Sequence, residues 1–376
     1  MSKRIRVLRI QHNFVEPTNH RLLEELARFP ELEVHALCPV WGVESGNMRV
    51  LRHSPGPNLE IGRTILTSHY ATTFYVTKLA SAVRRLKPDV INIHDEPWSL
   101  TTMQTLYYRR LFAPDSKLVF CSAQNIIKPY PFPFGAVERW NYREASAGYG
   151  CCEGVRDFVR AKGFTGRFDV IPLGIDPELF TYRQHDGRVA GRPFTIGYAG
   201  RITEEKGIFT LLKAFARIPA EAGGARLVYI GGGDALDRLR AEAEAAGVAD
   251  RVEFMPPLPH AKMPAALSRF DTLVVPSETT PTWKEQFGRV IVEAFSMGVP
   301  VIGSDSGSVP EIVGDAGLVF REKDLEQLSA HITSLMRNPE RLAVMSEQGR
   351  ARATELYTWR RVAEMCRDIY LDVANH

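Results

Sequence analysis

Residues 194–218 read FTIGYAGRITEEKGIFTLLKAFARI. The first six residues are a short apolar run typical of a buried strand, and residues 209–218 repeat apolar side chains with the period of a helix. A polar loop, residues 200–207, separates the two. A strand, a short polar loop and an amphipathic helix form the repeating unit of parallel sheets that carry helices on their faces. The segment therefore predicts an α/β sheet around residues 194–199.

The same alternation continues on both sides of this segment. Further along the chain, apolar runs predict strands at 227–231, 252–255, 272–276, 300–302 and 318–320, with helices at 235–246, 289–297 and 325–336. Before it, the pattern predicts strands at 6–10, 34–38, 90–93, 117–121 and 169–172, with helices at 19–28, 73–86 and 134–145. Sequence repeats of 20–50 residues are absent, so the sequence predicts two similar layered units and no repeat array.

The length of 376 residues suits two domains, because a single core rarely grows beyond about 250–300 residues. Residues 176–193 lose all periodicity and contain two glycines and two further prolines, which is typical of a linker. We predict a Rossmann-like N-terminal domain at 1–180, a linker at 181–193 and a second Rossmann-like domain at 194–356. A last helix at 357–376 is expected to return to the N-terminal domain. Ligands of such sheets bind at the carboxyl ends of the strands, in the cleft that two domains would form.

Composition excludes several classes of function. Lys and Arg number 47 against 44 Asp and Glu, and a net charge of +3 gives no reason to expect nucleic-acid binding. The apolar runs are far shorter than the ~20 residues of a membrane-spanning helix, and the N-terminus enters a strand without a signal-peptide core. The five cysteines lack metal-site spacing. These features predict a cytoplasmic protein; basic residues near 78–87 leave open a contact with the inner face of the membrane, although a solvated helix face is the favoured interpretation.

The loop at 200–207 carries the first candidate chemistry. Arg201 and Lys206 stand at the entrance of a predicted helix, between Gly200 and Gly207. Two cations beside a helix N-terminus, with glycines that let backbone approach closely, form a natural site for a diphosphate. Arg201 can contact two oxygens at once, whereas Lys206 acts as a mobile point charge. The alternative is that residues 204–206 are only a solvated first helical turn.

The second candidate loop is residues 277–294, SETTPTWKEQFGRVIVEA. Glu285 falls just before the predicted helix and Glu293 lies on it, while the amides of Phe287 and Gly288 stand at the helix entrance, where backbone N–H groups lack partners. Glu285 could accept hydrogen bonds from sugar hydroxyls, and Glu293 could hold a diol such as a ribose. The alternative is that Glu285 complements the helix dipole and Glu293 is a surface residue.

Taken in order, these two motifs resemble those of the retaining glycosyltransferases of family 4, which have the GT-B fold of two Rossmann-like domains. The resemblance rests on Gly200-Arg201-x4-Lys206-Gly207 followed by Glu285-x-Phe287-Gly288-x4-Glu293-Ala294. Supporting segments extend it across nearly the whole chain: PDVINIH at 88–94, VIPLGID at 170–176, GVPV at 298–301 and GSVPE at 307–311.

The resemblance implies a hexosyltransferase that uses a UDP-, GDP- or ADP-linked sugar, needs no metal ion or cofactor, and serves processes such as polysaccharide biosynthesis. The acceptor is a glycan, a lipid-linked sugar or a small molecule. It assigns catalytic roles at the diphosphate and the donor sugar to Arg201, Lys206 and Glu285. It assigns donor binding to Glu293 at the ribose, Leu258 beside the base, and the backbone of Gly200, Phe287 and Gly288.

The chain departs from the family pattern on the side where the acceptor is expected. Residues 11–19, QHNFVEPTN, replace a glycine-rich turn, and Thr18 or Asn19 is expected to cap the next helix. Gln124 or Asn125 occupies the place of a family histidine. His94 ends a predicted strand at the cleft and is either an acceptor ligand, a base or a structural residue. The acceptor-side candidates are Asn19, His94, Gln124 and Asn125.

Two other functions share these features. A nucleotide-sugar epimerase can have the same fold, and a nucleotide-sugar binding protein without turnover would fit the missing histidine. Release of nucleotide that depends on an acceptor would identify a transferase and not an epimerase. Hydrolysis or transfer of the donor sugar would eliminate the binding protein. A dinucleotide oxidoreductase is disfavoured because residues 11–19 contain no Gly-x-Gly-x-x-Gly.

Overall fold

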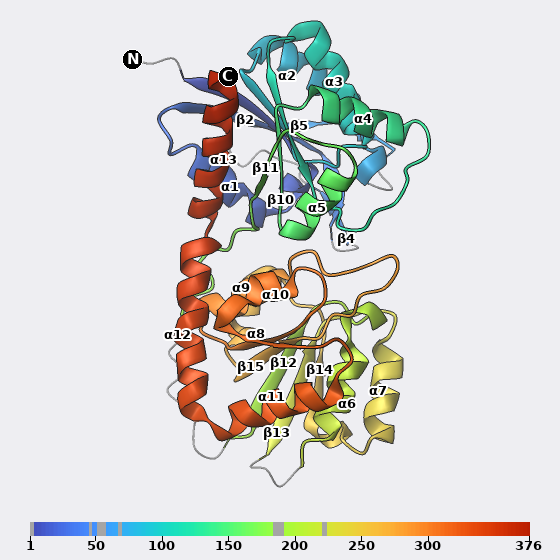
Figure 1. The fold of residues 1–376 in the computed structure, drawn as a ribbon, viewed down its shortest axis with the longest axis vertical. Coiled ribbons are helices and arrows are strands. Elements are labelled where there is room, and N and C mark those ends of the chain that lie inside the picture. The colour runs from blue at the N-terminus through green and yellow to red at the C-terminus, as the bar shows by residue number, and fades with distance from the viewer. Residues whose placement is uncertain (1–3, 45–46, 51–57, 67–69, 183–191, 220–223) are drawn as a thin grey trace. The chain divides into compact units, whose positions relative to one another are not determined.

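The chain folds into two compact units (Figure 1). The computed structural model describes residues 4–44, 47–50, 58–66, 70–182, 192–219 and 224–376. Unit 1 comprises Met1–Gly174 and Trp359–His376, and unit 2 comprises Ile175–Thr358. The chain therefore passes between units at 174–175 and again at 358–359. Most of the predicted linker at 181–193 lies outside the described residues.

Unit 1 is built on a seven-stranded parallel sheet in the order β11-β10-β9-β8-β1-β2-β5. Its strands are β1 (Ile5–Ile10), β2 (Leu32–Pro39), β5 (Leu59–Gly62), β8 (Val90–Ile93), β9 (Lys117–Ser122), β10 (Ala147–Gly150) and β11 (Arg167–Val170). Short antiparallel pairs join β3 (Trp41–Glu44) to β4 (Asn47–Val50) and β6 (Thr64–Ile65) to β7 (Phe74–Tyr75). In the central register Val7 stands opposite both Val34 and Val90.

Helices cover both faces of this sheet. They are α1 (His20–Leu26), α2 (Leu79–Leu86), α3 (Leu100–Phe112), α4 (Phe134–Glu144), α5 (Glu153–Ala161) and α13 (Trp359–Asn375). Because side chains alternate along a strand, Val7 packs on one face with α1 and α13, and Leu8 packs on the other with α2 and α3. Figure 1 shows α13 alongside α1, so the last helix belongs to unit 1, as the sequence predicts.

A buried arginine ties α13 to the sheet of unit 1. Arg9 on β1 is 1% exposed and donates to Oδ1 of Asn92 at 2.7 Å and to the hydroxyl of Tyr370 on α13 at 2.9 Å. The Tyr370 hydroxyl in turn donates to the same Asn92 oxygen at 2.7 Å. Among the described residues, every hydrogen bond of Arg9 goes to an uncharged side chain. These neutral partners must therefore take over the hydrogen bonds that water would give a guanidinium.

Tyr370→Phe is expected to lower the free energy of unfolding of unit 1 by about 1–3 kcal/mol, because it removes one partner of a buried charged donor. Urea unfolding followed by circular dichroism measures the change. Tyr107→Phe is the matched control, since Tyr107 is 54% exposed. Equal stability of the two variants would show that the Tyr370 hydroxyl contributes nothing to holding Arg9.

Unit 2 repeats the architecture with a six-stranded parallel sheet in the order β14-β13-β12-β15-β16-β17. Its strands are β12 (Phe194–Ala199), β13 (Ala225–Ile230), β14 (Val252–Met255), β15 (Thr272–Val275), β16 (Val301–Ser304) and β17 (Leu318–Phe320). Its helices are α6 (Ile208–Ala216), α7 (Leu236–Ala245), α8 (Met263–Leu267), α9 (Arg289–Ser296), α10 (Val309–Val313), α11 (Leu325–Arg337) and α12 (Pro339–Leu356).

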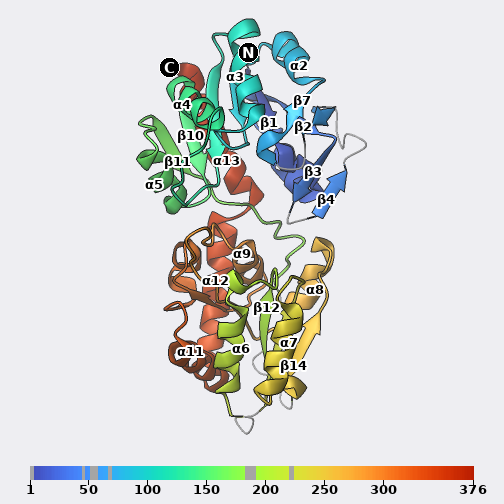
Figure 2. The same cartoon turned by 90° about the vertical axis from the view of Figure 1, so that its right-hand side faces the viewer.

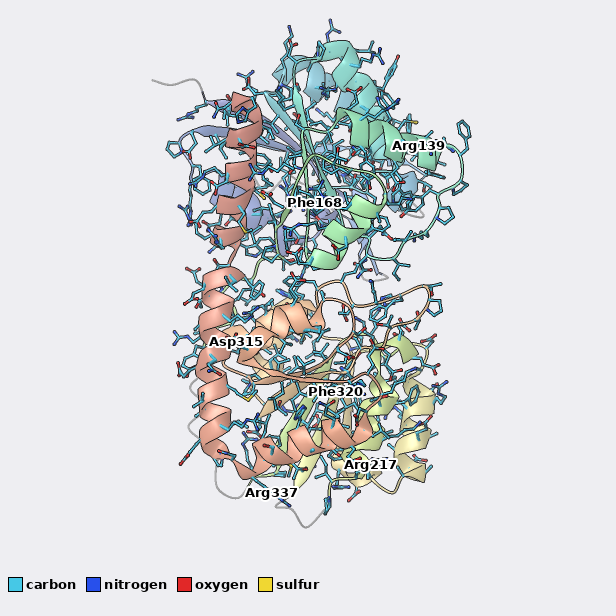
Figure 3. All side chains as sticks on the ribbon, viewed as in Figure 1. Arg139, Phe168, Arg217, Asp315, Phe320 and Arg337 are labelled. Carbon is cyan, nitrogen blue, oxygen red and sulfur yellow. The ribbon has the colours of Figure 1, made fainter. Side chains whose placement is uncertain are left out.

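The core of unit 2 lies between its sheet and the helices α6, α7 and α11. Figure 2 shows α6 beside α7, and α9 packs against β15, β16 and α12. Phe320 of β17 is 1% exposed in this core, as Phe168 is buried in a core cluster of unit 1 (both labelled in Figure 3). Across the described ranges, no helix has both the length and the apolar character that crossing a bilayer requires.

Candidate functional site

Lys206 and Glu285 meet at the carboxyl ends of the strands of unit 2. Lys206 follows β12 and Glu285 precedes α9, yet Nζ of the lysine lies 2.7 Å from Oε2 of the glutamate. The Ser277 hydroxyl donates to the same oxygen at 2.8 Å, and the ammonium lies 4.7 Å from the centre of the Trp283 ring. Both side chains are largely buried, with 19% and 10% exposure. The structure thus brings together two of the three predicted catalytic residues.

Two glycines allow the loops of this site to approach each other closely. Gly207 has φ +66° at the start of α6, and a Cβ there would collide with the carbonyl oxygen of Pro276. Gly307 has φ +55°, and a Cβ there would collide with the carbonyl oxygen of Glu285, which also accepts from the amide of Ser308 at 3.1 Å. A side chain at either position would push the loops apart. The backbone therefore fixes where Lys206 and Glu285 meet.

Arg201 lies at the edge of the same cluster. Its guanidinium is half-exposed and sits 3.4 Å from Glu205, and no hydrogen bond among the described residues joins it to Glu285. Its carbonyl oxygen accepts from the Tyr198 hydroxyl at 2.5 Å. Burial raises the pKa of Tyr198, the charge of Glu285 raises it further, and the charge of Arg201 lowers it. Arg201 and Glu285 therefore act on one buried hydroxyl, and the guanidinium is exposed enough to contact a ligand.

Glu293 is buried on α9 and has a partner that the sequence analysis missed. Its Oε1 lies 3.0 Å from Nε2 of His260, and its side chain is 6% exposed. His260 packs at 65° to the Phe180 ring, and its Nδ1 is buried without a hydrogen-bond partner. Leu258 is half-buried two residues earlier in the same loop after β14. His260 begins a short 3-10 helix (His260–Lys262), and a lone histidine there carries no pattern that would have identified it from sequence.

The predicted backbone groups occupy two different positions. Gly288 has φ +70° and immediately precedes α9, while Phe287 is 3% exposed and packs edge-on to Tyr357. Their amides therefore stand before the first turn of the helix. The amide of Gly200 is different, because it donates to the carbonyl oxygen of Ile230 at 3.0 Å. The Gly200 N–H is therefore already used within the sheet. The residue can only let a ligand approach the backbone closely.

The acceptor-side candidates all lie in unit 1. Asn19 is buried at the start of α1, but its side chain donates to the carbonyl oxygen of Asn13 at 2.7 Å and makes no capping bond. The Thr18 hydroxyl is buried without a partner, so the prediction of a side-chain cap is wrong. The physical reason is that a 3-10 turn at Pro17–Asn19 runs directly into α1, and Asn19 already has helical φ and ψ.

Gln124 and Asn125 belong to a loop that a buried carboxylate organises. Glu96 accepts from the Ser122 hydroxyl and from the amide of Ala123, both at 2.9 Å, and from the Gln124 side chain. Burial raises the pKa of Glu96, and these donors oppose that effect. Asn125 is 7% exposed. The Gln124 amide is therefore at least partly engaged in holding its own loop.

Metal ligands do not gather at either set of candidates. Among the described residues, no three His, Cys, Asp or Glu side chains come together in a way that could hold a metal ion. A hollow of about 540 Å³ in unit 2 is lined by residues such as Asp305, Arg321 and Gln327, and none of the predicted site residues lines it. The candidate chemistry of unit 2 thus rests on the Lys206–Glu285 pair, with Arg201 and Glu293 near the same strand ends.

Two parallel α/β sheets, each covered by helices, form the architecture of the GT-B class of glycosyltransferase folds, and solved structures of that class align with this chain. Sucrose-phosphate synthase from Thermosynechococcus elongatus aligns over 98% of this chain and 99% of its own, with a TM-score of 0.73 and 19% identity. Anabaena HepE in complex with UDP aligns over 98% of this chain and 100% of its own, with a TM-score of 0.70 and 18% identity. At these identities the likeness establishes the fold alone.

Sequence comparison then gives the family. Residues 15–179 match the family model described as Glycosyltransferase Family 4, and residues 183–352 match the model described as Glycosyl transferases group 1. Between them the two models span most of both units. The chain belongs to the family 4 glycosyltransferases.

Curated relatives match over part of their length. A GDP-mannose-dependent alpha-(1-6)-phosphatidylinositol monomannoside mannosyltransferase of Mycobacterium tuberculosis is 30% identical over 56% of this chain and 57% of its own. A D-inositol 3-phosphate glycosyltransferase of Segniliparus rotundus is 32% identical over 53% of this chain and 45% of its own. A glycogen synthase of M. tuberculosis is 29% identical over 63% of this chain and 56% of its own. The matches thus span about half the length of these relatives.

Proposed function

We propose that the protein is a retaining glycosyltransferase that moves a hexosyl group from a nucleotide-diphosphate sugar to a hydroxyl acceptor. The observation that carries the proposal is the Lys206–Glu285 contact of 2.7 Å at the strand ends of unit 2. A cation and an acid, 79 residues apart in sequence, are held together there. That arrangement suits a leaving diphosphate next to a sugar whose hydroxyls need an acceptor.

The residues divide the work by their chemistry. Lys206 and the half-exposed Arg201 would neutralise the diphosphate as the glycosidic bond breaks, and Glu285 would orient the sugar through its hydroxyls. The amides before α9 would add partial positive charge beside the phosphate. Glu293 would bind the ribose diol. We assign no metal ion and no cofactor to the reaction, because these cations supply the positive charge that the leaving group needs.

The donor and acceptor are proposed as classes. The mycobacterial relative is named for GDP-mannose and HepE was solved with UDP, so GDP- and UDP-sugars are the first donors to test, with ADP-sugars next. The acceptor is a glycan, a lipid-linked sugar or a small polyol. A cytoplasmic location, with or without contact at the membrane surface, suits such donors.

A two-part experiment tests the proposed function. Thermal shift with UDP, GDP, ADP and their hexose conjugates identifies the donor, because a ligand of the native state alone raises the melting temperature. Release of nucleotide is then measured with and without candidate acceptors, and the anomer of the product is read by NMR. Acceptor-dependent release with a retained anomer supports the proposal. Conversion of the donor sugar into another sugar without an acceptor would indicate an epimerase. Binding of the nucleotide sugar without any turnover would indicate a binding protein.

Glu293→Ala is expected to weaken donor binding by about 10- to 100-fold with a smaller effect on kcat, because loss of hydrogen bonds to a charged group costs about 1.5–3 kcal/mol. Isothermal titration with the nucleotide diphosphate measures Kd. Glu355→Ala, an exposed acid on α12, is the control. Wild-type Kd for the Glu293 variant would remove this residue from the donor site.

A further inference from the structure

The geometry around His94 in unit 1 points to a function that its residue type alone does not suggest. We infer that His94 is a permanently neutral hydrogen-bond donor, and that its Nε2–H group binds an oxygen atom of the acceptor substrate. This inference rests on the proposed function for the identity of the ligand. It replaces the alternative of a base at this position with a group that positions the acceptor and takes no proton.

The tautomer follows from the partners of the other ring nitrogen. Nδ1 of His94 lies 3.1 Å from an Nη of Arg9 and 2.9 Å from the Tyr149 hydroxyl. A guanidinium can only donate hydrogen bonds and does not lose its proton in proteins, so Nδ1 must accept and carries no hydrogen. In a neutral imidazole the hydrogen then resides on Nε2. Arg9 therefore sets the direction of the hydrogen bond that His94 can offer.

The surroundings also disfavour protonation of the ring. The pKa of His94 is lowered well below its usual range by burial, by the charge of Arg9 and by His12. The titratable groups that contact it or affect its charge are Arg9 on β1, His12 just after β1 and Tyr149 on β10. The buried carboxylates of Asp95 and Glu96 follow it in the chain, and Asp95 is paired with His12. Arg9 is 1% exposed and its hydrogen bonds among the described residues all go to uncharged side chains, so its positive charge next to Nδ1 opposes protonation of the ring.

The free nitrogen lies where a ligand of unit 1 would bind. His94 follows directly after β8, and its backbone amide continues the sheet by donating to Ile10 at 2.8 Å. Ligands of parallel sheets bind at these carboxyl ends. His94 is half-buried, and Nε2 has no hydrogen-bond partner among the described residues. A donor whose direction is fixed and whose partner is missing suits a hydroxyl or phosphate oxygen of the acceptor.

Two substitutions test the roles of Nδ1 and Nε2 separately. His94→Asn places an amide oxygen near the position of Nδ1, where it can still accept from Arg9, but it has no donor at the position of Nε2. His94→Gln reaches the position of Nε2 with an N–H group and keeps the donor there. We expect His94→Asn to raise the acceptor KM by about tenfold or more, the effect of losing one hydrogen bond, and His94→Gln to remain within about threefold of wild type. The donor KM should not change in either variant.

The probes are myo-inositol, methyl α-mannoside and methyl α-glucoside, each assayed with the nucleotide sugar that gives the largest thermal shift. Nitrogen-15 NMR of histidine-labelled protein supplies a readout that does not depend on activity, and comparison with His94→Gln identifies the signal among the ten histidines. We expect Nε2 to carry a hydrogen at all values from pH 5 to 8. We also expect its signal to shift when a probe that the enzyme accepts as a sugar acceptor binds.

Three results would overturn the inference. The first is hydrogen on Nδ1 or titration of His94 between pH 5 and 8. The second is an acceptor KM of His94→Asn equal to that of wild type. The third is an Nε2 signal that does not shift when a probe that serves as a sugar acceptor binds. Failure of the wild-type protein to turn over any nucleotide sugar counts against the proposed function instead, and the NMR result for the tautomer stands apart from it.

Discussion

Lys206→Ala is expected to reduce the rate of sugar transfer by at least about 100-fold, as the loss of one group that stabilises developing charge commonly does. The ammonium is held between the Glu285 carboxylate and the Trp283 ring, and the side chain is 19% exposed. A cation fixed in this way needs no rearrangement when a diphosphate arrives. Its removal should therefore affect kcat more strongly than the binding of the nucleotide.

The control for Lys206→Ala is Lys213→Ala, which removes a 59% exposed lysine from α6 of the same unit. Steady-state kinetics with saturating donor measures kcat, and the melting temperature tests folding, because the substitution leaves the buried Glu285 carboxylate without its cation. A folded Lys206→Ala protein that keeps more than a tenth of the wild-type kcat would contradict the role of this lysine. Near-normal kinetics are expected for Lys213→Ala.

The fold could largely be predicted from local pattern because the central strands are buried on both faces. The run Val90–Ile93 lies inside its sheet, is buried throughout and has bounds that match the prediction. The bounds of Val252–Met255 also match, although this strand is half-buried at the edge of its sheet. The strand at Ala147–Gly150 escaped prediction because AGYG resembles a loop. Gly148 is required there by tertiary contact, since a Cβ would collide with Phe120. Contacts of that kind are not visible in a local window of sequence.

The candidate site also has features that the sequence pattern predicts and features that depend on tertiary contact. The spacing of the two motifs places Lys206 and Glu285 on loops that follow strands of one sheet, and the structure brings their side chains into contact. Sequence could not pair His260 with Glu293, because one residue begins a 3-10 helix and the other lies on α9, 33 residues further along the chain. It also could not give the tautomer of His94, which depends on an arginine 85 positions away. Residue types were readable from sequence, but their mutual orientation was not.

Glu285→Ala is expected to lower transfer by at least about 100-fold as well, but for a different physical reason. Its carboxylate accepts from both Lys206 and Ser277, so it fixes the ammonium and also offers oxygen atoms to the hydroxyls of a sugar. Glu285→Gln keeps the shape and one acceptor oxygen and removes the charge. If orientation of the sugar is the main role, Gln should recover part of the activity that Ala loses.

A double-mutant cycle with Lys206→Ala then separates the two contributions. Residues that act as one unit give losses that do not add, so the double variant should be little worse than either single variant. Additive losses in kcat would instead mean that Lys206 and Glu285 serve independent steps. Glu340→Gln, an exposed acid at the start of α12, is the control for the loss of one negative charge in unit 2. Full activity of a folded Glu285→Ala protein would rule out this carboxylate as a ligand of the donor sugar, and with it the assignment on which the proposed chemistry of unit 2 depends.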